Sequence, residues 1–171
     1  MAALARAYGR LLGLCAALAA LLLLAMVAGI TLDVVARNAW GWSVRGVDEL
    51  SEYALYLMAV LTAPWLLRQG QHVRIDMLLV ALPPRLAWRL EFVGDALGLA
   101  ITLVLAWYGT AALLDSLRIG ALVMKTYVFP EWWTLLPLPV SLALLAVEFV
   151  FRLHRLAAGP RAPRVEATAV A

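Results

Sequence analysis

Four long apolar runs alternate with short charged stretches along the chain. The runs cover residues of about 11–32, 47–67, 94–117 and 131–151, and charged residues stand at or near the ends of each run. A helix needs roughly 20 mostly apolar residues to cross the hydrocarbon core of a bilayer, where no water satisfies an open backbone. The pattern therefore predicts an all-α integral membrane protein with four transmembrane helices in one membrane domain, residues 1–156.

The first run also has features of a signal peptide, because Arg6 and Arg10 precede it and Ala28 could stand at a cleavage site. Its apolar stretch is longer than the roughly 7–15 residues of a signal-peptide core. We therefore expect a spanning helix that anchors the chain.

The loop between the second and third runs has a pattern of its own. From about 73 to 90 its Leu and Ile residues follow mostly helical spacing, with Arg and Asp on the other side. This amphipathic pattern predicts a helical segment that lies in the membrane interface and breaks at Pro83-Pro84. Residues 157–171, rich in Ala, Pro and Arg, are predicted to form a disordered tail.

Basic residues are distributed unevenly between the two sides of the predicted domain. With the N-terminus inside, the two tails and the second loop hold ten of the 14 Lys and Arg residues, and the other two loops hold four. Because cytoplasmic loops are enriched in basic residues, both termini are predicted to be cytoplasmic. Six of the seven Trp residues fit interfacial belts at span ends, and we expect the exception, Trp107, to pack against another helix.

Composition agrees with a membrane protein and argues against nucleic-acid binding. The chain is 65% hydrophobic and 15% charged, whereas soluble domains are about 25% charged. The net charge of +3 comes from short clusters that flank the apolar runs, which is a topology signal and not a groove-binding face. The single cysteine, Cys15, can form no disulfide framework or thiolate metal cluster within the chain.

The sequence predicts no catalytic, cofactor-binding or metal-binding residue and no enzymatic activity. Ionisable residues stand near span ends, whereas membrane enzymes and pumps keep them at depth. His72 and His154 lack metal-ligand spacing. Internal repeats and helices broken by polar groups, which are usual in transporters that work alone, are also missing from the pattern.

Two sets of residues point to packing with other helices or subunits. On the third run, Gly94 and Gly98 form a GxxxG within a small, partly polar face that also holds Glu91, Asp95, Thr102, Ala106 and Gly109. Such a face lets another helix approach closely, either in this chain or in a partner. Before the second run, Arg45 and Asp48 stand four residues before Glu49 and Glu52. These residues fit a solvated helix start or a contact with an extracytoplasmic partner.

The stretch 37–76 resembles the small permease subunit, the Q-type or DctQ-like subunit, of TRAP (tripartite ATP-independent periplasmic) transporters. The matching features are Arg37, the run Asp48-Glu49-Leu50 with Tyr53, and the run 68–76, which reads RQGQHVRID. The LPPR at 82–85 and the PEWW at 130–133 are also similar, and the likeness covers roughly residues 10–155. One departure is Thr62-Ala63-Pro64, where the family often has Gly-Ala-Ala.

The resemblance implies a supporting subunit in the bacterial inner membrane. In such systems a periplasmic binding protein delivers a solute, often a carboxylate or dicarboxylate, and a large permease subunit imports it with an ion gradient, usually of Na⁺. The small subunit would brace the large one and meet the binding protein directly or through the large subunit, with membrane lipid around it. The structural or subunit-interface candidates are Arg37, Asp48, Glu49, Tyr53, Arg68, Gly70, His72, Asp76, Gly94 and Gly98.

Two alternative functions stay open at this point. The chain could be a small membrane-embedded redox or enzyme subunit, which an absorbance spectrum would detect by its cofactor. It could also be a self-associating scaffold that uses the GxxxG face, in which case cross-linked species would be multiples of 18.6 kDa.

Overall fold

The computed structural model describes residues 2–43, 45–69 and 83–158 of the chain. Its long helices are α1 (Ala2–Trp40), α2 (Val47–Arg68), α4 (Pro84–Ile119) and α6 (Pro137–Ala158), and a one-turn helix α5 (Trp132–Leu135) precedes α6. Four helical segments in this part of the chain are long and apolar enough to cross a membrane. The prediction of an all-α membrane protein with four spanning helices is thereby confirmed.

The third long helix begins earlier than the apolar run predicted. α4 starts at Pro84 and continues without a break through the third run, so residues 84–90 extend this helix. Proline suits the first turn of a helix because its missing N–H has no partner there, and Pro83 before it is extended, with ψ at 142°. The proline pair therefore stands at the start of α4, and the interfacial segment before it stays a prediction. Residues 73–82 of the predicted interfacial segment, and the tail from 159 on, lie outside the described residues.

A short β-hairpin joins α4 to α5. Strand β1 (Leu122–Met124) pairs antiparallel with β2 (Val128–Pro130), and Val123 lies opposite Phe129. α4 ends just before the hairpin at Gly120, whose positive φ of 66° lets its N–H reach the Ser116 carbonyl. The hydropathy pattern did not predict these strands.

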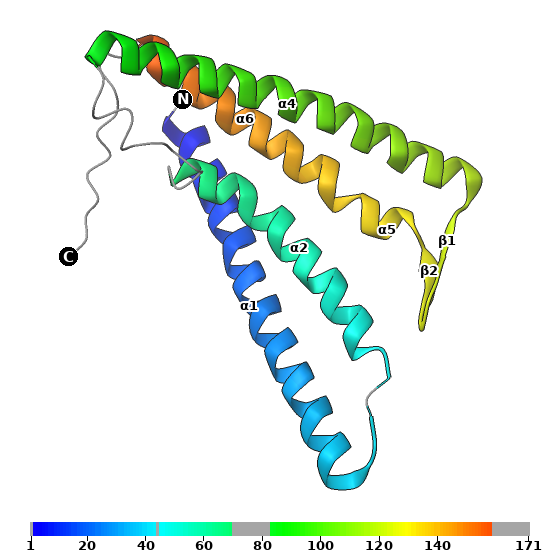
Figure 1. Cartoon of the computed structure of the whole chain (residues 1–171). Helices are drawn as coiled ribbons and strands as arrows, with labels where there is room; N and C mark the ends of the chain where they lie inside the picture. The colour runs from blue at the N-terminus through cyan, green and yellow to red at the C-terminus, as the bar shows by residue number, and fades with distance from the viewer. Residues whose placement is uncertain (1, 44, 70–82, 159–171) are drawn as a thin grey trace, which may run out of the picture.

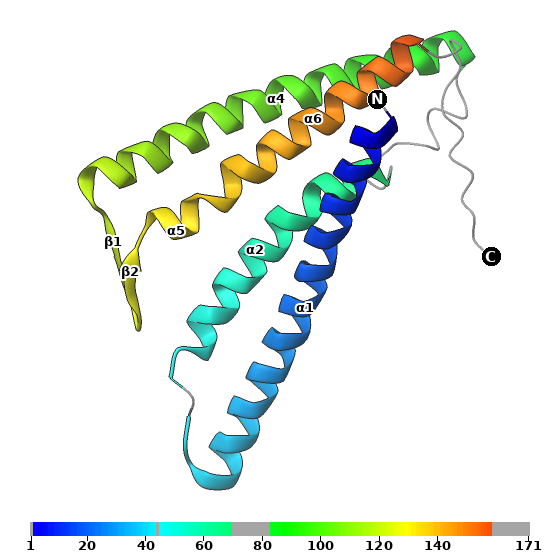
Figure 2. The same ribbon diagram turned by 180° about the vertical axis from the view of Figure 1, so that it is seen from behind.

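The helices form two pairs that meet at one end and spread apart toward the other. α1 packs along α2, α4 packs along α6, and α2 contacts α6 to join the pairs (Figures 1 and 2). The pairs converge where α1 begins and α6 ends, which we call the terminal end. The β-hairpin and the loop between α1 and α2 lie at the opposite ends of the pairs.

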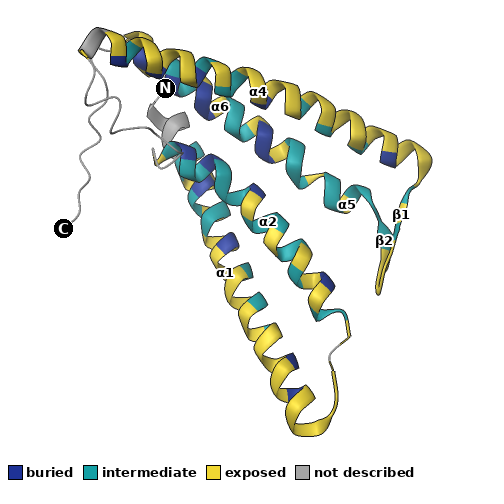
Figure 3. Cartoon of the chain, in the orientation of Figure 1, coloured by how far each residue is buried: buried dark blue, intermediate teal, exposed yellow. Residues whose placement is uncertain are grey.

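Most of the apolar surface of the chain faces outward. Exposed residues cover much of α1 and the outer side of α4, and buried residues follow narrow lines between helices (Figure 3). Leu24, near the middle of α1, is 70% exposed, and Trp107 on α4 is 75% exposed. In water such a surface would be unusual, but lipid or partner helices can cover it in a membrane. No described helix of this chain covers Trp107, so the expectation that it packs against another helix stays a prediction.

A proline shapes the joint between α2 and α6. Pro64 lies fully buried inside α2, and because proline has no N–H, the carbonyl of Val60 one turn earlier has no partner in its own helix. The hydroxyl of the buried Ser141, on α6, donates its hydrogen bond to this Val60 carbonyl. Pro64, which departs from the family pattern, thus leaves the Val60 carbonyl available to accept the hydrogen bond from α6.

Replacing Ser141 by Ala is expected to lower the free energy of unfolding by about 1 kcal/mol, because the buried Val60 carbonyl loses its donor. In a Pro64→Ala background the same change should cost less, since residue 64 can then donate to Val60 within α2. A double-mutant cycle by denaturant titration in micelles measures this difference. Ser51→Ala is the control, because the Ser51 hydroxyl bonds within its own helix, to Val47. If Ser141→Ala lowered the free energy of unfolding equally in both backgrounds, the hydrogen bond of Ser141 would not depend on Pro64.

Candidate functional site

A buried arginine joins three helices near the terminal end. Arg152, on α6, is 5% exposed, and its Nε donates to both carboxylate oxygens of Asp95 on α4, at 3.2 and 3.1 Å. Its Nη2 lies 3.0 Å from Oδ1 of Asp95, and its Nη1 donates to the Leu67 carbonyl on α2 at 3.1 Å. A carbonyl in the last turn of a helix lacks an intrahelical donor and lies at the negative end of the helix dipole, so a guanidinium suits it well.

A second ion pair lies on the same helix. Glu148 is 1% exposed, and one of its carboxylate oxygens accepts a hydrogen bond from Arg155 at 2.8 Å. Glu148, Arg152 and Arg155 follow a spacing of four and three residues, which places them on one side of α6. Glu148 and Arg152 are buried against the other helices and Arg155 is exposed at the edge of this side, so the buried carboxylate has a charged partner.

Aromatic residues bring α1 into the same region. The Tyr8 hydroxyl donates to the Leu144 carbonyl of α6 at 2.8 Å, and its ring meets the Phe151 ring edge-on at 5.8 Å between centroids. The guanidinium carbon of Arg68, at the end of α2, lies 5.5 Å from the Tyr8 ring centroid, within cation–π range. We call the residues Tyr8, Arg68, Asp95, Glu148, Arg152 and Arg155 the terminal cluster; together they link all four long helices.

A second set of contacts ties the β-hairpin to the start of α2. The backbone N–H of Thr126 donates to Oε2 of the buried Glu49 at 2.9 Å, and the Lys125 ammonium lies 2.7 Å from Glu52. The Tyr127 hydroxyl donates to the Arg45 carbonyl at 3.2 Å. We call these residues, 45, 49, 52 and 125–127, the hairpin cluster.

Two details of the hairpin cluster depend on its geometry. Gly46 has a φ of 81°, and the Tyr127 ring lies so close that a side chain at position 46 would collide with it. The hydrogen bond from Lys125 to the Glu52 carboxylate raises the pKa of the Lys125 ammonium. Both side chains are largely exposed, so this pair adds little stability by itself.

Within the described residues, no three His, Cys, Asp or Glu side chains lie close enough together to hold a metal ion. The polar contacts of Arg152, Tyr8 and Glu49 join one element to another.

Comparison with family models agrees with this arrangement. Residues 26–159 match the model described as Tripartite ATP-independent periplasmic transporters, DctQ component. The chain belongs to this family. It is therefore a small membrane subunit of a TRAP transporter, a component of systems in which a large permease and a binding protein also take part. A search of individual curated proteins gives no match.

The residues that the sequence singled out in this DctQ-family chain lie in different places. Arg37 pairs with Asp33 one turn earlier, at 2.6 Å, and so makes a local contact at the end of α1. Tyr53 meets the Phe129 ring edge-on and has Lys125 above its face. Asp48 is exposed, whereas Glu49 and Arg68 belong to the two clusters. Gly70, His72 and Asp76 lie outside the described residues.

The acids before the second span contact the chain's own hairpin. The sequence left open a solvated helix start or an extracytoplasmic partner, and the described contacts of Glu49 and Glu52 go to residues 125 and 126. Oε1 of Glu49 has no hydrogen-bond partner among the described residues, although its environment is buried. A role of Glu49 at a subunit interface stays a prediction.

The small, partly polar face of the third span lies against α6 of the same subunit. Glu91, Asp95 and Thr102 are buried, and the Phe149 ring lies directly over Gly98. Gly94 has open space where a side chain would stand. The close approach therefore depends on Gly98, and the GxxxG pair does not act as one packing surface inside this chain.

Sequence reasoning did not single out Tyr8, Glu148, Arg152 or Arg155 as site residues, although they hold the terminal cluster together. A signal was present in the spacing of Glu148, Arg152 and Arg155 along one side of α6. Because these residues stand near the end of a span, they were expected at the membrane interface, and the burial of Glu148 and Arg152 was not predicted.

Proposed function

We propose that this subunit braces the large permease, which imports a carboxylate delivered by a periplasmic binding protein and driven by an ion gradient. The observation that carries the proposal is the terminal cluster, in which Arg152 contacts both Asp95 and the Leu67 carbonyl. Buried charge-assisted hydrogen bonds have a defined geometry, so they hold α2, α4 and α6 in one arrangement. The hairpin cluster does the same for α2 and the hairpin. Such a frame suits a static support.

We place the subunit in the bacterial inner membrane with the terminal end in the cytoplasm. The terminal end carries Arg10, Arg68, Arg89, Arg152 and Arg155, and the tail beyond 158 adds two more arginines. The enrichment of basic residues on the cytoplasmic side supports this orientation. The hairpin cluster then lies on the periplasmic side, where the binding protein docks to the transporter.

Trp107 supports a partner along α4. It stands near the middle of the third apolar run, on the side of the helix opposite to the Gly98 face that packs on α6. Its indole N–H has no hydrogen-bond partner among the described residues, and hydrocarbon would offer none. We propose that the large permease covers this side of α4.

A pull-down of the tagged chain from its native membrane in gentle detergent, with mass spectrometry, tests the proposal. The expected result is a stoichiometric partner with many predicted spans. Recovery of this chain alone, as multiples of its own mass, would support a self-associating scaffold instead. Recovery with redox proteins and a cofactor spectrum would support the redox alternative. Either result would overturn the bracing function.

Replacing Trp107 by Ala is expected to weaken co-purification of the large permease by about tenfold, as for a Trp at the centre of an interface. The control is Trp40→Ala, which removes an equally exposed indole, 77%, from the end of α1, where tryptophans commonly meet lipid headgroups. Equal recovery of the permease with both variants would show that the Trp107 side of α4 faces lipid.

A further inference from the structure

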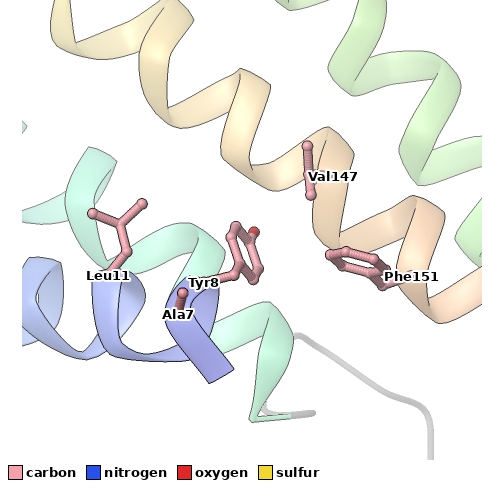
Figure 4. Close-up of a pocket in the computed structure, with 5 residues that line it drawn as sticks. All are labelled: Ala7, Tyr8, Leu11, Val147 and Phe151. Carbon is pink, nitrogen blue, oxygen red and sulfur yellow. The ribbon is translucent and has the colours of Figure 1, made fainter. Parts of the chain in front are cut away.

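An apolar crevice opens between α1 and α6 at the terminal end. Its volume is about 360 Å³, and Ala7, Tyr8, Leu11, Val147 and Phe151 line it (Figure 4). The one polar atom among these side chains is the Tyr8 hydroxyl, which is already bonded to the Leu144 carbonyl. The lining that remains is aromatic rings and aliphatic groups, which offer no hydrogen bond to water or to a polar ligand.

The crevice is accessible from the hydrocarbon side. Leu11 and Val147, on its two walls, are 45% and 42% exposed. α1 and α6 make few direct contacts, so the crevice is open to the membrane, and hydrocarbon that fills it gains dispersion contacts with both walls. A flexible hydrocarbon chain fits these walls, whereas water does not.

Two basic side chains lie near the crevice at the terminal end. Val147, Phe151 and Arg155 are spaced four residues apart, so Arg155 continues the α6 wall by one turn toward the end of the helix. Its side chain is 53% exposed, and a guanidinium has five N–H donors, of which the hydrogen bond to Glu148 takes one. On the other side, Arg68 lies over the Tyr8 ring that lines the crevice.

We propose that this crevice binds one anionic phospholipid. An acyl chain lies between Tyr8 and Leu11 on α1 and Val147 and Phe151 on α6, and the phosphate meets the guanidinium groups of Arg155 and Arg68. The arrangement matches an amphiphile with a negative head, because apolar walls and basic groups follow one another along the helix axes. The lipid completes the packing of α1 on α6. This inference requires only that the chain lies in a membrane, and it is independent of the bracing function.

Native mass spectrometry of the full-length chain, purified in mild detergent with any partner that follows it, tests the site. The probes are palmitoyl-oleoyl phosphatidylglycerol and the phosphatidylcholine with the same chains. We expect one phosphatidylglycerol to stay bound about tenfold more strongly than phosphatidylcholine, because two basic groups face its phosphate. Equal retention of the two lipids would overturn the anionic site.

Two pairs of variants separate the acyl-chain and headgroup parts of the site. Val147→Trp fills the crevice and should abolish retention, whereas Val150→Trp, at a similarly exposed α6 position outside it, should not. Arg155→Gln should reduce the preference for phosphatidylglycerol about fivefold, whereas Arg89→Gln, an exposed arginine of the same end on α4, should leave it unchanged. Unchanged retention by Val147→Trp would overturn the proposal.

A second filling variant guards against misfolding. Leu11→Trp enters the crevice from the α1 wall, and its melting temperature without added lipid reports whether the fold is intact. A photo-cross-linking residue at position 147 gives an independent readout. Capture of phospholipid supports the site, and capture of the large permease or of this chain's own residues 70–82 or 159–171 would show that a protein segment fills it.

Discussion

Replacing Arg152 by Ala is expected to lower the free energy of unfolding by about 3–5 kcal/mol, as for removal of one partner from a buried ion pair. The Asp95 carboxylate would be left in a site where it is 6% exposed, and the Leu67 carbonyl would lose its hydrogen bond from the guanidinium. The contacts between α6 and both α2 and α4 would weaken together. Denaturant titration in mixed micelles, followed by tryptophan fluorescence, measures the change.

Arg118→Ala is the matched control for this prediction, because Arg118 is an exposed arginine near the end of α4. Its removal should change stability by less than about 0.5 kcal/mol. The variants Asp95→Asn and Arg152→Gln, alone and together, form a double-mutant cycle, and a coupling of about 1–3 kcal/mol is expected for directly bonded side chains. An Arg152→Ala protein as stable as the Arg118→Ala protein would show that the terminal cluster does not hold the helices together.

Replacing Gly98 by Ala is expected to destabilise the chain by about 1–3 kcal/mol, the usual cost of overfilling a packed interface. A Cβ atom at this position would lie 2.6 Å from Cζ of Phe149. The Phe149 ring is buried, so it cannot move aside without displacing its neighbours, and α4 would be pushed away from α6. Thermal unfolding in detergent measures the effect.

Gly94→Ala is the control for Gly98→Ala, since it is the same change one turn earlier in the same helix. A Cβ at position 94 would meet nothing within 4 Å. Alanine favours helix over glycine, so this variant should be neutral or up to about 1 kcal/mol more stable. Equal destabilisation by the two changes would indicate that a partner helix packs on both glycines, as the GxxxG pattern alone suggested.

The spanning helices could be predicted because lipid imposes a simple rule on the sequence. Each helix must supply its own backbone partners and about 20 apolar residues, and both requirements can be read along the chain. The start of α4 could not be predicted in this way, because Pro83-Pro84 suits both a break within a helix and the first turn of a new one. The strands at 122–124 and 128–130 are too short to give a periodic signal.

The residues of the terminal cluster are visible in the sequence, but their pairing is not. Asp95 and Arg152 are 57 residues apart in the sequence. Several other basic residues near the same span ends were equally reasonable partners for Asp95. The resemblance to the family directed attention to residues 37–76, part of which lies outside the described residues, and away from α6. Trp107 is a different case, since the pattern identified an unusual position that no described part of this chain covers.

Local composition by itself determined that this chain is a membrane protein with four spanning helices, and the order of its motifs indicated the family. Hydropathy and motif order are properties of neighbouring residues, so no knowledge of the fold is needed to read them. The tertiary structure decided which charges are buried together. It also decided that the Val60 carbonyl, left without a donor by Pro64, accepts a hydrogen bond from Ser141, and that α6 packs closely on Gly98 but not on Gly94. These outcomes depend on how one helix is rotated and shifted against another, and a rotation by one residue would exchange a buried side chain for one that faces lipid.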